Sequence, residues 1–234
     1  MQIGAFFTQC WYVLPVAALV AYLCGSVNFA ILISRIFTKD DIRNYGSGNA
    51  GATNMLRAKG PGLAALTMVG DLLKAVVAVE FSRWFAGACA VPTAAEGVLI
   101  DPVFAAAYVA GVFCIIGHLY PVFFGFRGGK GVVATLGMYL VLEWKMAILC
   151  LGVFIIVVAL TKWVSLGSLC GVLPIAPLTF LSTYVLADTS LFTALFCTVL
   201  GASVTLIVFI KHASNIRRLL DGTESKISFK KKEG

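Results

Sequence analysis

Long apolar runs occupy most of this sequence, and they limit the chain to a helical fold inside a lipid bilayer. A membrane-spanning helix needs about 20 predominantly apolar residues. Runs near this length lie at 12–35, 62–84, 102–121, 146–161, 164–187 and 190–210. Hydrophobic residues make up 60% of the chain and charged residues only 12%, against about 25% charged in soluble domains. A soluble globule of this composition could not cover its core, so we expect an all-α integral membrane protein.

A further apolar segment, Val132–Leu142, is shorter than the other runs. Glu143, Trp144 and Lys145 separate it from the run at 146–161. A single helix over 132–161 would be about 45 Å long, whereas the hydrocarbon core of a bilayer is about 30 Å thick. We therefore expect two short helices joined at this break, which gives seven transmembrane helices.

The distribution of positive charge predicts how these spans are oriented. Lys and Arg gather in the 38–60 segment, the 122–131 segment and the 211–234 tail, whereas Arg83 and Lys145 stand alone on the opposite side. The four tryptophans, at 11, 84, 144 and 163, fall at span ends, where amphipathic rings prefer to sit. Because positive charge concentrates on the cytosolic side of membrane proteins, we expect the N-terminus outside and the C-terminus in the cytosol.

Three polar segments on the predicted cytosolic side carry residues suited to chemistry. The first, 44–57, contains Gly46, Gly48 and Gly51 in the spacing of a dinucleotide fingerprint, but that motif requires a preceding strand, which is not predicted. Glycines allow backbone N–H groups to converge on an anion. The segment adds the side-chain donors Ser47, Asn49, Thr53, Asn54 and Arg57. We interpret it as an anion site; the alternative is a Gly/Asn-rich turn with a snorkelling arginine at a span end.

The second segment is Gly125–Gly131, which leads directly into the apolar run at 132. It is not a Walker A loop, because Phe124 replaces a required glycine and Gly131 replaces the Ser or Thr that binds magnesium. Gly128 and Gly129 with Lys130 still offer N–H groups, a helix N-terminus and an ammonium to a phosphate. The alternative is a basic hairpin that anchors to anionic lipid.

The third segment begins the basic tail 211–234, which follows a single membrane domain over 1–210. Helical spacing puts His212 and Asn215 on one face, with Arg218 continuing that ridge. The alternative is a polybasic stop beside the membrane, an interpretation that we accept for Lys230–Lys232.

Ionisable residues also occur inside the predicted spans. Asp71 and Lys74 are three residues apart in an apolar run, so we expect an ion pair on one helix face. His118, near the end of the 102–121 span, is a candidate general base, although a lone histidine there is more often structural. No C-x-x-C, H-E-x-x-H or cluster of acidic ligands occurs, so no metal is expected.

With these segments in view, the chain resembles the bacterial membrane acyl-phosphate:glycerol-3-phosphate acyltransferase family (PlsY). The matching stretches, in order, are Gly46–Arg57, Asp71–Lys74, Gly117–Pro121, Gly128–Gly131, Ser165–Gly167, His212–Ile216 and Gly222–Glu224. The resemblance covers nearly the whole chain. It departs at Asn28 and Ala30, where many members have Pro and Gly, and this affects the geometry of the first span.

The resemblance implies seven spans, an external N-terminus and a location in the bacterial inner membrane, with the active site on the cytosolic face. It implies acyl transfer from acyl phosphate to glycerol 3-phosphate, which gives lysophosphatidic acid and inorganic phosphate without a cofactor. Carried over by position, Ser47, Arg57, Lys130, His212 and Asn215 are expected to be catalytic. Residues expected to bind substrate or phosphate are Gly48, Asn49, Thr53, Asn54, Gly128, Gly129, Gly131, Ser165 and Glu224. Membrane lipid and a peripheral enzyme that produces acyl phosphate are the expected partners.

The chemistry of an acyl phosphate fits these residues. We expect Lys130 and the Gly128–Gly131 amides to hold the leaving phosphate, Arg57 to hold the glycerol phosphate, and Ser47 and Asn215 to position the hydroxyl or the carbonyl. The proton acceptor is His212, His118 or the phosphate of the donor. The His-x-x-x-x-Asp relay of other glycerolipid acyltransferases is absent.

Two other classes of protein are alternatives. A transporter of anionic lipid would be expected to show internal repeats and polar residues at the bilayer midplane, and we find neither. A lipid-surface scaffold would leave the Gly/Asn segments unexplained. The net charge of the chain is +7, and its charged residues lie between and after the apolar runs. This distribution favours lipid headgroups or anionic substrates over nucleic acid as partners.

Overall fold

The computed structural model describes residues 11–89 and 100–227, and within these ranges the chain is helical and contains no strand. Six helical segments are long and apolar enough to cross a membrane: Val13–Thr38, Pro61–Cys89, Pro102–Phe124, Trp144–Thr161, Val164–Leu186 and Leu191–Lys211. The all-α membrane architecture expected from the apolar runs is therefore confirmed. Cys10, which the predicted orientation puts on the external side together with Cys89, and the Lys230–Lys232 run are not among the described residues.

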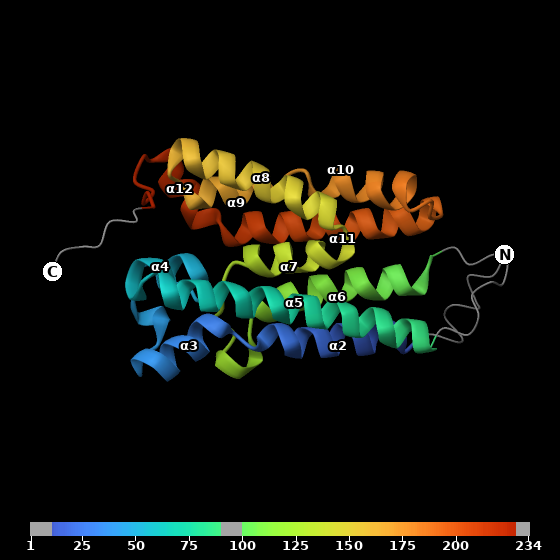
Figure 1. Cartoon of the computed structure of the whole chain (residues 1–234), viewed down its shortest axis with the longest axis horizontal. Coiled ribbons are helices and arrows are strands. Elements are labelled where there is room, and N and C mark those ends of the chain that lie inside the picture. Colours follow the sequence, from blue (N-terminus) through green and yellow to red (C-terminus); the bar gives the residue numbers. More distant parts are fainter. Residues whose placement is uncertain (1–10, 90–99, 228–234) are drawn as a thin grey trace.

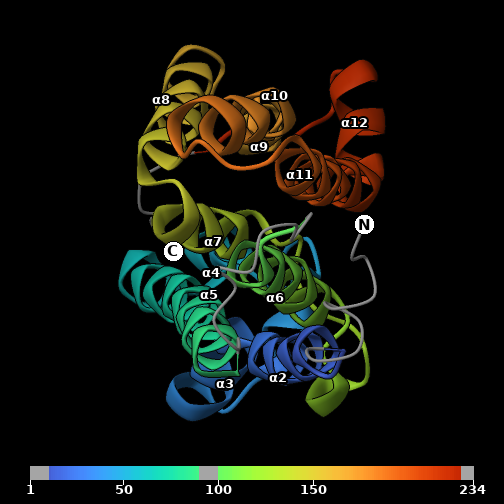
Figure 2. The ribbon, with the colours of Figure 1, turned by 90° about the vertical axis from the view of Figure 1, so that its right-hand side faces the viewer.

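The helices form two layers (Figures 1 and 2). One layer contains α2 (Val13–Ser26), α3 (Phe29–Thr38), α5 (Pro61–Cys89) and α6 (Pro102–Leu119). The other contains α8 (Trp144–Thr161), α9 (Val164–Val172), α10 (Ile175–Phe180) and α11 (Leu191–Lys211). The short helix α7 (Val132–Leu142) lies between them (Figure 2). Groups contributed by both layers can therefore meet around α7.

The first span is broken, although the sequence predicted one helix over 12–35. Helix α2 ends at Ser26 and α3 begins at Phe29. Asn28 causes the restart, because its side-chain oxygen accepts a hydrogen bond from Ile31 N at 3.1 Å and so caps α3. Its amide also lies 3.4 Å from the Ala50 carbonyl, which links the break to the first polar segment.

Helices α2 and α6 approach closely at glycines. A Cβ at Gly25 would overlap the Cys114 carbonyl, and one at Gly117 would overlap the Tyr22 carbonyl. In a membrane, helices gain stability by close van der Waals packing, which small residues allow. This contact fixes the end of α6, from which the second polar segment leaves.

Helix α7 ends at Leu142, and the chain reverses at Glu143 into α8, as the sequence predicted (Figure 1). Eleven residues span about 16 Å, roughly half the thickness of a hydrocarbon core. The break is confirmed, whereas the count of seven crossings stays a prediction because α7 alone is too short to cross.

The run predicted as one span over 164–187 is interrupted. Helix α9 ends at Val172, and α10 (Ile175–Phe180) is followed by the π-helical η3 (Leu181–Leu186). Pro174 and Pro177 account for the interruption, since proline lacks an N–H and clashes with the preceding turn.

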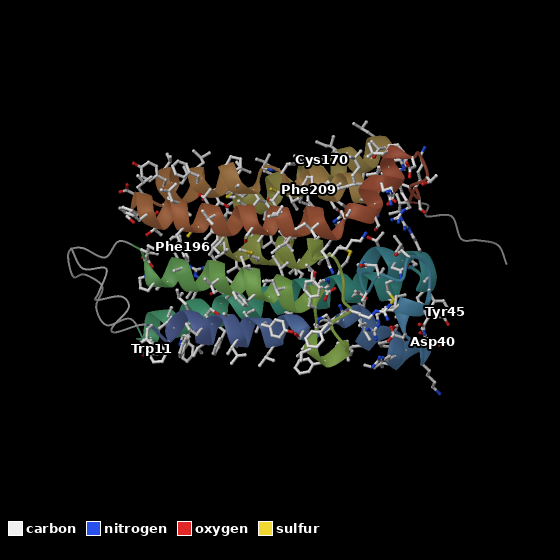
Figure 3. The ribbon with its side chains drawn as sticks, turned by 180° about the vertical axis from the view of Figure 1, so that it is seen from behind. Trp11, Asp40, Tyr45, Cys170, Phe196 and Phe209 are labelled. Atoms are coloured by element: carbon white, nitrogen blue, oxygen red, sulfur yellow. The ribbon has the colours of Figure 1, made fainter. Side chains whose placement is uncertain are left out.

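The polar segments lie at one end of the molecule. Asp40 and Tyr45 mark that end, and Trp11 lies at the opposite end (Figure 3). The basic 38–60 segment contains η1 (Ile42–Asn44) and the short helix α4 (Ala52–Lys59). The other polar segments are the connection through η2 (Val122–Phe124) to α7, and α12 (Ala213–Leu220), which follows α11.

Candidate active site

Two adjoining cavities lie where these segments meet. The first, which we call the cationic cavity, has a volume of about 520 Å³. Its basic side chains are Arg43, Arg127, Lys130, Lys211 and Arg218, and its lining residues include no carboxylate. Such a concentration of positive charge is suited to phosphate.

The second, which we call the apolar cavity, has a volume of about 370 Å³. Met68, Val133, Phe154 and Val158 contribute its apolar walls, and Met68 is 47% exposed on the outer surface of α5. Ser47, Asn49 and Lys130 line both cavities. A polar site and an apolar site therefore meet at three side chains.

All site residues predicted from the sequence line one or both of these cavities. Gly48, Gly128 and Gly129 line the cationic cavity. Thr53, Asn54, Arg57, His118, Gly131, Ser165, His212, Asn215 and Glu224 line the apolar cavity. The structure thus brings together side chains from positions 47 to 224, and their individual roles stay predictions.

Asn54 shapes the first polar segment. Its side-chain oxygen accepts from Ser47 N at 3.0 Å, and its amide donates to the Tyr45 carbonyl at 2.9 Å and the Asn49 carbonyl at 3.0 Å. Gly46, at φ +56°, supports the tight path of this loop. Asn54, expected from the sequence to bind substrate, is therefore engaged with its own loop, while Ser47 is exposed toward the cavities.

The second segment is docked on α6. The N–H groups of Gly128 and Gly129 donate to the carbonyls of Leu119 and His118, each at 3.1 Å. The sequence assigned these amides to a phosphate, but here they hold the loop in place. Gly131, at φ +83°, begins α7 with no side-chain cap, so the first turn of α7 presents unpaired donors and the positive end of a helix dipole.

Arg43 connects the first and second segments, a role that the sequence did not suggest. Its Nη1 donates to the Phe124 carbonyl at 2.8 Å and to the Arg127 carbonyl at 3.1 Å. Asp41 holds the other side of the guanidinium at 2.8 Å, and hydrogen bonds from Arg43 keep the pKa of Asp41 well below its usual range. Arg43 thereby fixes the two loops relative to each other.

A hydrogen-bonded chain positions Lys130. Its ammonium donates to the Asn215 side-chain oxygen, and Asn215 donates to Glu224 Oε1 at 2.7 Å. Ser165 and Arg218 also donate to Glu224, at 2.8 and 2.7 Å. Burial lowers the pKa of Lys130 to about 8, and the positive charges of Arg218 and Arg57 act in the same direction. Burial raises the pKa of Glu224, but these three hydrogen bonds outweigh it and hold that pKa below its usual value.

His212 presents an acceptor to the apolar cavity. Its Nδ1 lies 2.8 Å from the Val208 carbonyl; because a carbonyl can only accept, Nδ1 carries the proton and Nε2 has a free lone pair. Burial, together with the charge of Lys130, lowers the pKa of His212 to about 4. The imidazole is therefore neutral at physiological pH.

The chain after α12 crosses back over the apolar cavity, which Ile227 helps to line. Ile227 N donates to the Lys162 carbonyl at 2.8 Å, and Trp163 Nε1 donates to the Glu224 carbonyl at 3.2 Å. Arg57 in α4 reaches the Ser225 carbonyl at 3.2 Å. Residues 221–227, which we call the strap, therefore link the two layers beside the cavity.

Under the first and second segments lies a buried polar cluster. Lys74 Nζ is 2.8 Å from Asp71 Oδ1, which confirms the predicted ion pair. It is also 2.9 Å from His118 Nδ1 and 2.8 Å from the Val27 carbonyl. Among the described residues, no group of three His, Cys, Asp or Glu side chains could hold a metal ion.

In a membrane protein, a cationic cavity that adjoins an apolar cavity is suited to an enzyme that acts on an anionic group and a lipid chain. The family model for glycerol-3-phosphate acyltransferase matches residues 15–222. The chain belongs to this family, and it is an acyltransferase.

Relatives match along almost their whole length. The glycerol-3-phosphate acyltransferase of Clostridioides difficile (strain 630) is 41% identical over 216 residues, which covers 92% of this chain and 96% of the relative. That of Neisseria meningitidis serogroup C is 39% identical over 211 residues, or 90% and 96% of the two chains.

Two crystal structures of the membrane acyltransferase PlsY (YgiH) share the fold. The glycerol 3-phosphate form is 30% identical with a TM-score of 0.68, and the lysophosphatidic acid form is 28% identical with a TM-score of 0.70. Each alignment covers 92% of this chain and 95% of the other.

Proposed function

We propose that this acyltransferase transfers an acyl chain from acyl phosphate to glycerol 3-phosphate and releases lysophosphatidic acid and inorganic phosphate. The observation that carries the proposal is the junction of the cationic and apolar cavities at Ser47, Asn49 and Lys130. One reactant must be small and anionic, and the other must carry an apolar chain.

Glycerol 3-phosphate is assigned to the cationic cavity. Arg127 and Lys211 supply positive charge there, and Lys130 lies at its inner edge. Related structures contain glycerol 3-phosphate and lysophosphatidic acid, which supports the same acceptor and product here. Arg57 lines the adjoining apolar cavity, and its planar guanidinium is suited to bind a phosphate.

The acyl phosphate is assigned to the apolar cavity. Its chain would lie along Met68 and Phe154, with access from the lipid-facing side of α5. Its phosphate would face Lys130 and the uncapped first turn of α7, an arrangement that favours an anion.

The reaction then forms one ester bond and breaks one anhydride bond. The acceptor hydroxyl oxygen attacks the acyl carbonyl carbon, and the bond from that carbon to the phosphate oxygen breaks. Ser47 and Asn215 orient the reacting groups, and Lys130 stabilises the departing phosphate. Nε2 of His212 accepts a hydrogen bond from the attacking hydroxyl. Because the pKa of His212 is about 4, the hydroxyl proton passes on to the departing phosphate, which is more basic than the imidazole.

The membrane arrangement completes the proposal. Seven crossings, with the N-terminus outside, place both cavities on the cytosolic face of the bacterial inner membrane. The basic polar segments lie at the end opposite Trp11 (Figure 3), which supports this orientation. A peripheral enzyme that makes acyl phosphate would supply the donor from the same side.

The test offers each donor separately to purified protein in detergent, with glycerol 3-phosphate and a metal chelator. We expect acyl phosphate to give lysophosphatidic acid and an equal amount of inorganic phosphate, and acyl-CoA to give neither. A protein with Lys130→Ala is the matched control for uncatalysed transfer. Comparable turnover with acyl-CoA, or none with acyl phosphate, would overturn the proposal.

A further inference from the structure

The two histidines of the chain, His118 and His212, both line the apolar cavity but differ in which ring nitrogen has a partner in the protein. Val208 fixes the proton of His212 on Nδ1. His118 instead has its Nδ1 against the ammonium of Lys74, at 2.9 Å. The buried cluster below the cavity therefore decides what His118 offers to a ligand.

The contacts of Lys74 determine where the proton of this cluster lies. Its ammonium donates to the Val27 carbonyl at 2.8 Å, lies 2.9 Å from His118 Nδ1 and pairs with Asp71 Oδ1 at 2.8 Å, whereas His118 Nδ1 is farther from Asp71 Oδ1, at 3.5 Å. An alkyl amine is a stronger base than an imidazole by about four pKa units. Lys74 is thus the donor and His118 Nδ1 the acceptor, which leaves the imidazole proton on Nε2.

Nε2 of His118 lies between the first and second polar segments. A Cβ added to Gly129 would overlap this nitrogen and would come within 2.7 Å of the Ala50 carbonyl. Within the part of the chain that the structure describes, Nε2 has no hydrogen-bond partner, although His118 is only 4% exposed. Because His118 lines the apolar cavity, an N–H at this nitrogen is available to a bound molecule.

We infer that His118 is a hydrogen-bond donor to the phosphate held beside the Gly128–Gly131 loop, and that Asp71 and Lys74 are positioning residues that fix its Nε2–H tautomer. This assignment excludes His118 as the general base, because the nitrogen that faces the cavity carries a proton. The ligand it would meet is an anionic oxygen, either of the donor's phosphate or of free phosphate. The role in turnover rests on the proposed function, whereas the tautomer does not.

The tautomer can be measured directly. In protein labelled with ¹⁵N-histidine, we expect two neutral rings of opposite type, with His118 protonated on Nε2 and His212 on Nδ1. Removing His212 by substitution with asparagine assigns the remaining signals to His118. Inorganic phosphate, added as the probe, should shift the Nε2–H proton of His118. Protonation of His118 on Nδ1, or no shift at phosphate concentrations that inhibit turnover, would overturn the inference.

Two amide substitutions separate the roles of His118. In His118→Gln the amide can donate from the place of Nε2, whereas in His118→Asn the amide oxygen can accept from Lys74 at the place of Nδ1 and no donor remains at Nε2. We expect kcat/KM to fall less than about 10-fold in the first and at least about 100-fold in the second. Better activity of the asparagine variant would assign His118 to packing, and equal large losses would indicate a base; both outcomes overturn the inference.

The positioning role has its own readout. The double variant Asp71→Asn, Lys74→Met removes both buried charges together, so neither is left unpaired. We expect His118 in this variant to lose its fixed tautomer and to show substantial protonation on Nδ1. An unchanged Nε2–H tautomer would contradict the role of Lys74. If wild-type protein shows the expected tautomers but makes no product from acyl phosphate, the proposed function fails and the tautomer assignment stands.

Discussion

The carboxylate of Glu224 accepts a 2.7 Å hydrogen bond from the side-chain amide of Asn215. This contact sets the orientation of that amide, because its nitrogen must face Glu224 and its oxygen must then face Lys130. A residue in the strap after α12 thereby determines how an ammonium is held between the two cavities.

Glu224→Gln should weaken this arrangement, since a neutral amide binds the guanidinium of Arg218 less strongly than a carboxylate does. We expect kcat/KM to fall about 10-fold or more and the thermal unfolding temperature at pH 7 to fall. The pKa of Glu224 is lowered in the folded protein, so its stabilisation is present above the unfolded value of about 4.3 and is lost as pH falls through the folded pKa. The difference in unfolding temperature between wild type and variant should therefore shrink in acid, and a difference that grows in acid would contradict the assignment.

Arg57→Ala and Lys130→Ala should each lower kcat/KM by at least about 100-fold, or roughly 2.7 kcal/mol of transition-state stabilisation. The reason is that each removes a cation from a wall of the reaction site. Lys39→Ala is the matched control, because Lys39 is an exposed cation at the same end of the protein and lines neither cavity. Steady-state assays check this, and near-normal activity of Lys130→Ala would refute its role.

The pH dependence of the reaction should report Lys130. Its pKa is lowered to about 8 by burial, so the ammonium is lost as pH rises through that value, and kcat/KM should decline above about pH 8. His212, with a pKa of about 4, does not titrate in this range. Lys130→Arg should remove the alkaline decline, because arginine stays charged. An identical decline in that variant would assign it to another group.

Topology is testable with Cys89, at the end of α5, and with the C-terminal tail. We expect Cys89 to react with a membrane-impermeant thiol reagent added outside the cell, and a tail fusion to a phosphatase that folds only outside the cytosol to be inactive. The same phosphatase fused after α5 is the positive control. A strong signal from the tail fusion would contradict seven crossings.

The sequence predicted the location of the spans and the break at Glu143 well, because apolar length and charge are local properties. It placed the three polar segments on one side, and the structure brings their residues to the walls of two adjoining cavities. It did not predict the break at Asn28, which depends on a side-chain cap within a short stretch, and it did not predict the helix at Ala52–Lys59.

Hydrogen-bond partners were the harder part of the site. From the sequence, the N–H groups of Gly128 and Gly129 were expected to bind phosphate. In the structure they donate instead to backbone carbonyls of α6. Arg43 reads as a loop charge, since its carbonyl partners are more than 80 residues away in sequence. Such contacts depend on the path of the whole chain, and no local pattern encodes them.

For the proposed reaction at the junction of the two cavities, the concentrations of the two reactants are expressed in different units. Glycerol 3-phosphate is a solute, so its supply is an amount per volume of cytosol. In the proposed reaction the acyl donor lies in the bilayer, so its supply would be an amount per area of membrane. Inert lipid would dilute the donor and leave the acceptor unchanged. As a cell enlarges its envelope, each copy of the enzyme would slow unless donor synthesis kept pace with the expanding surface.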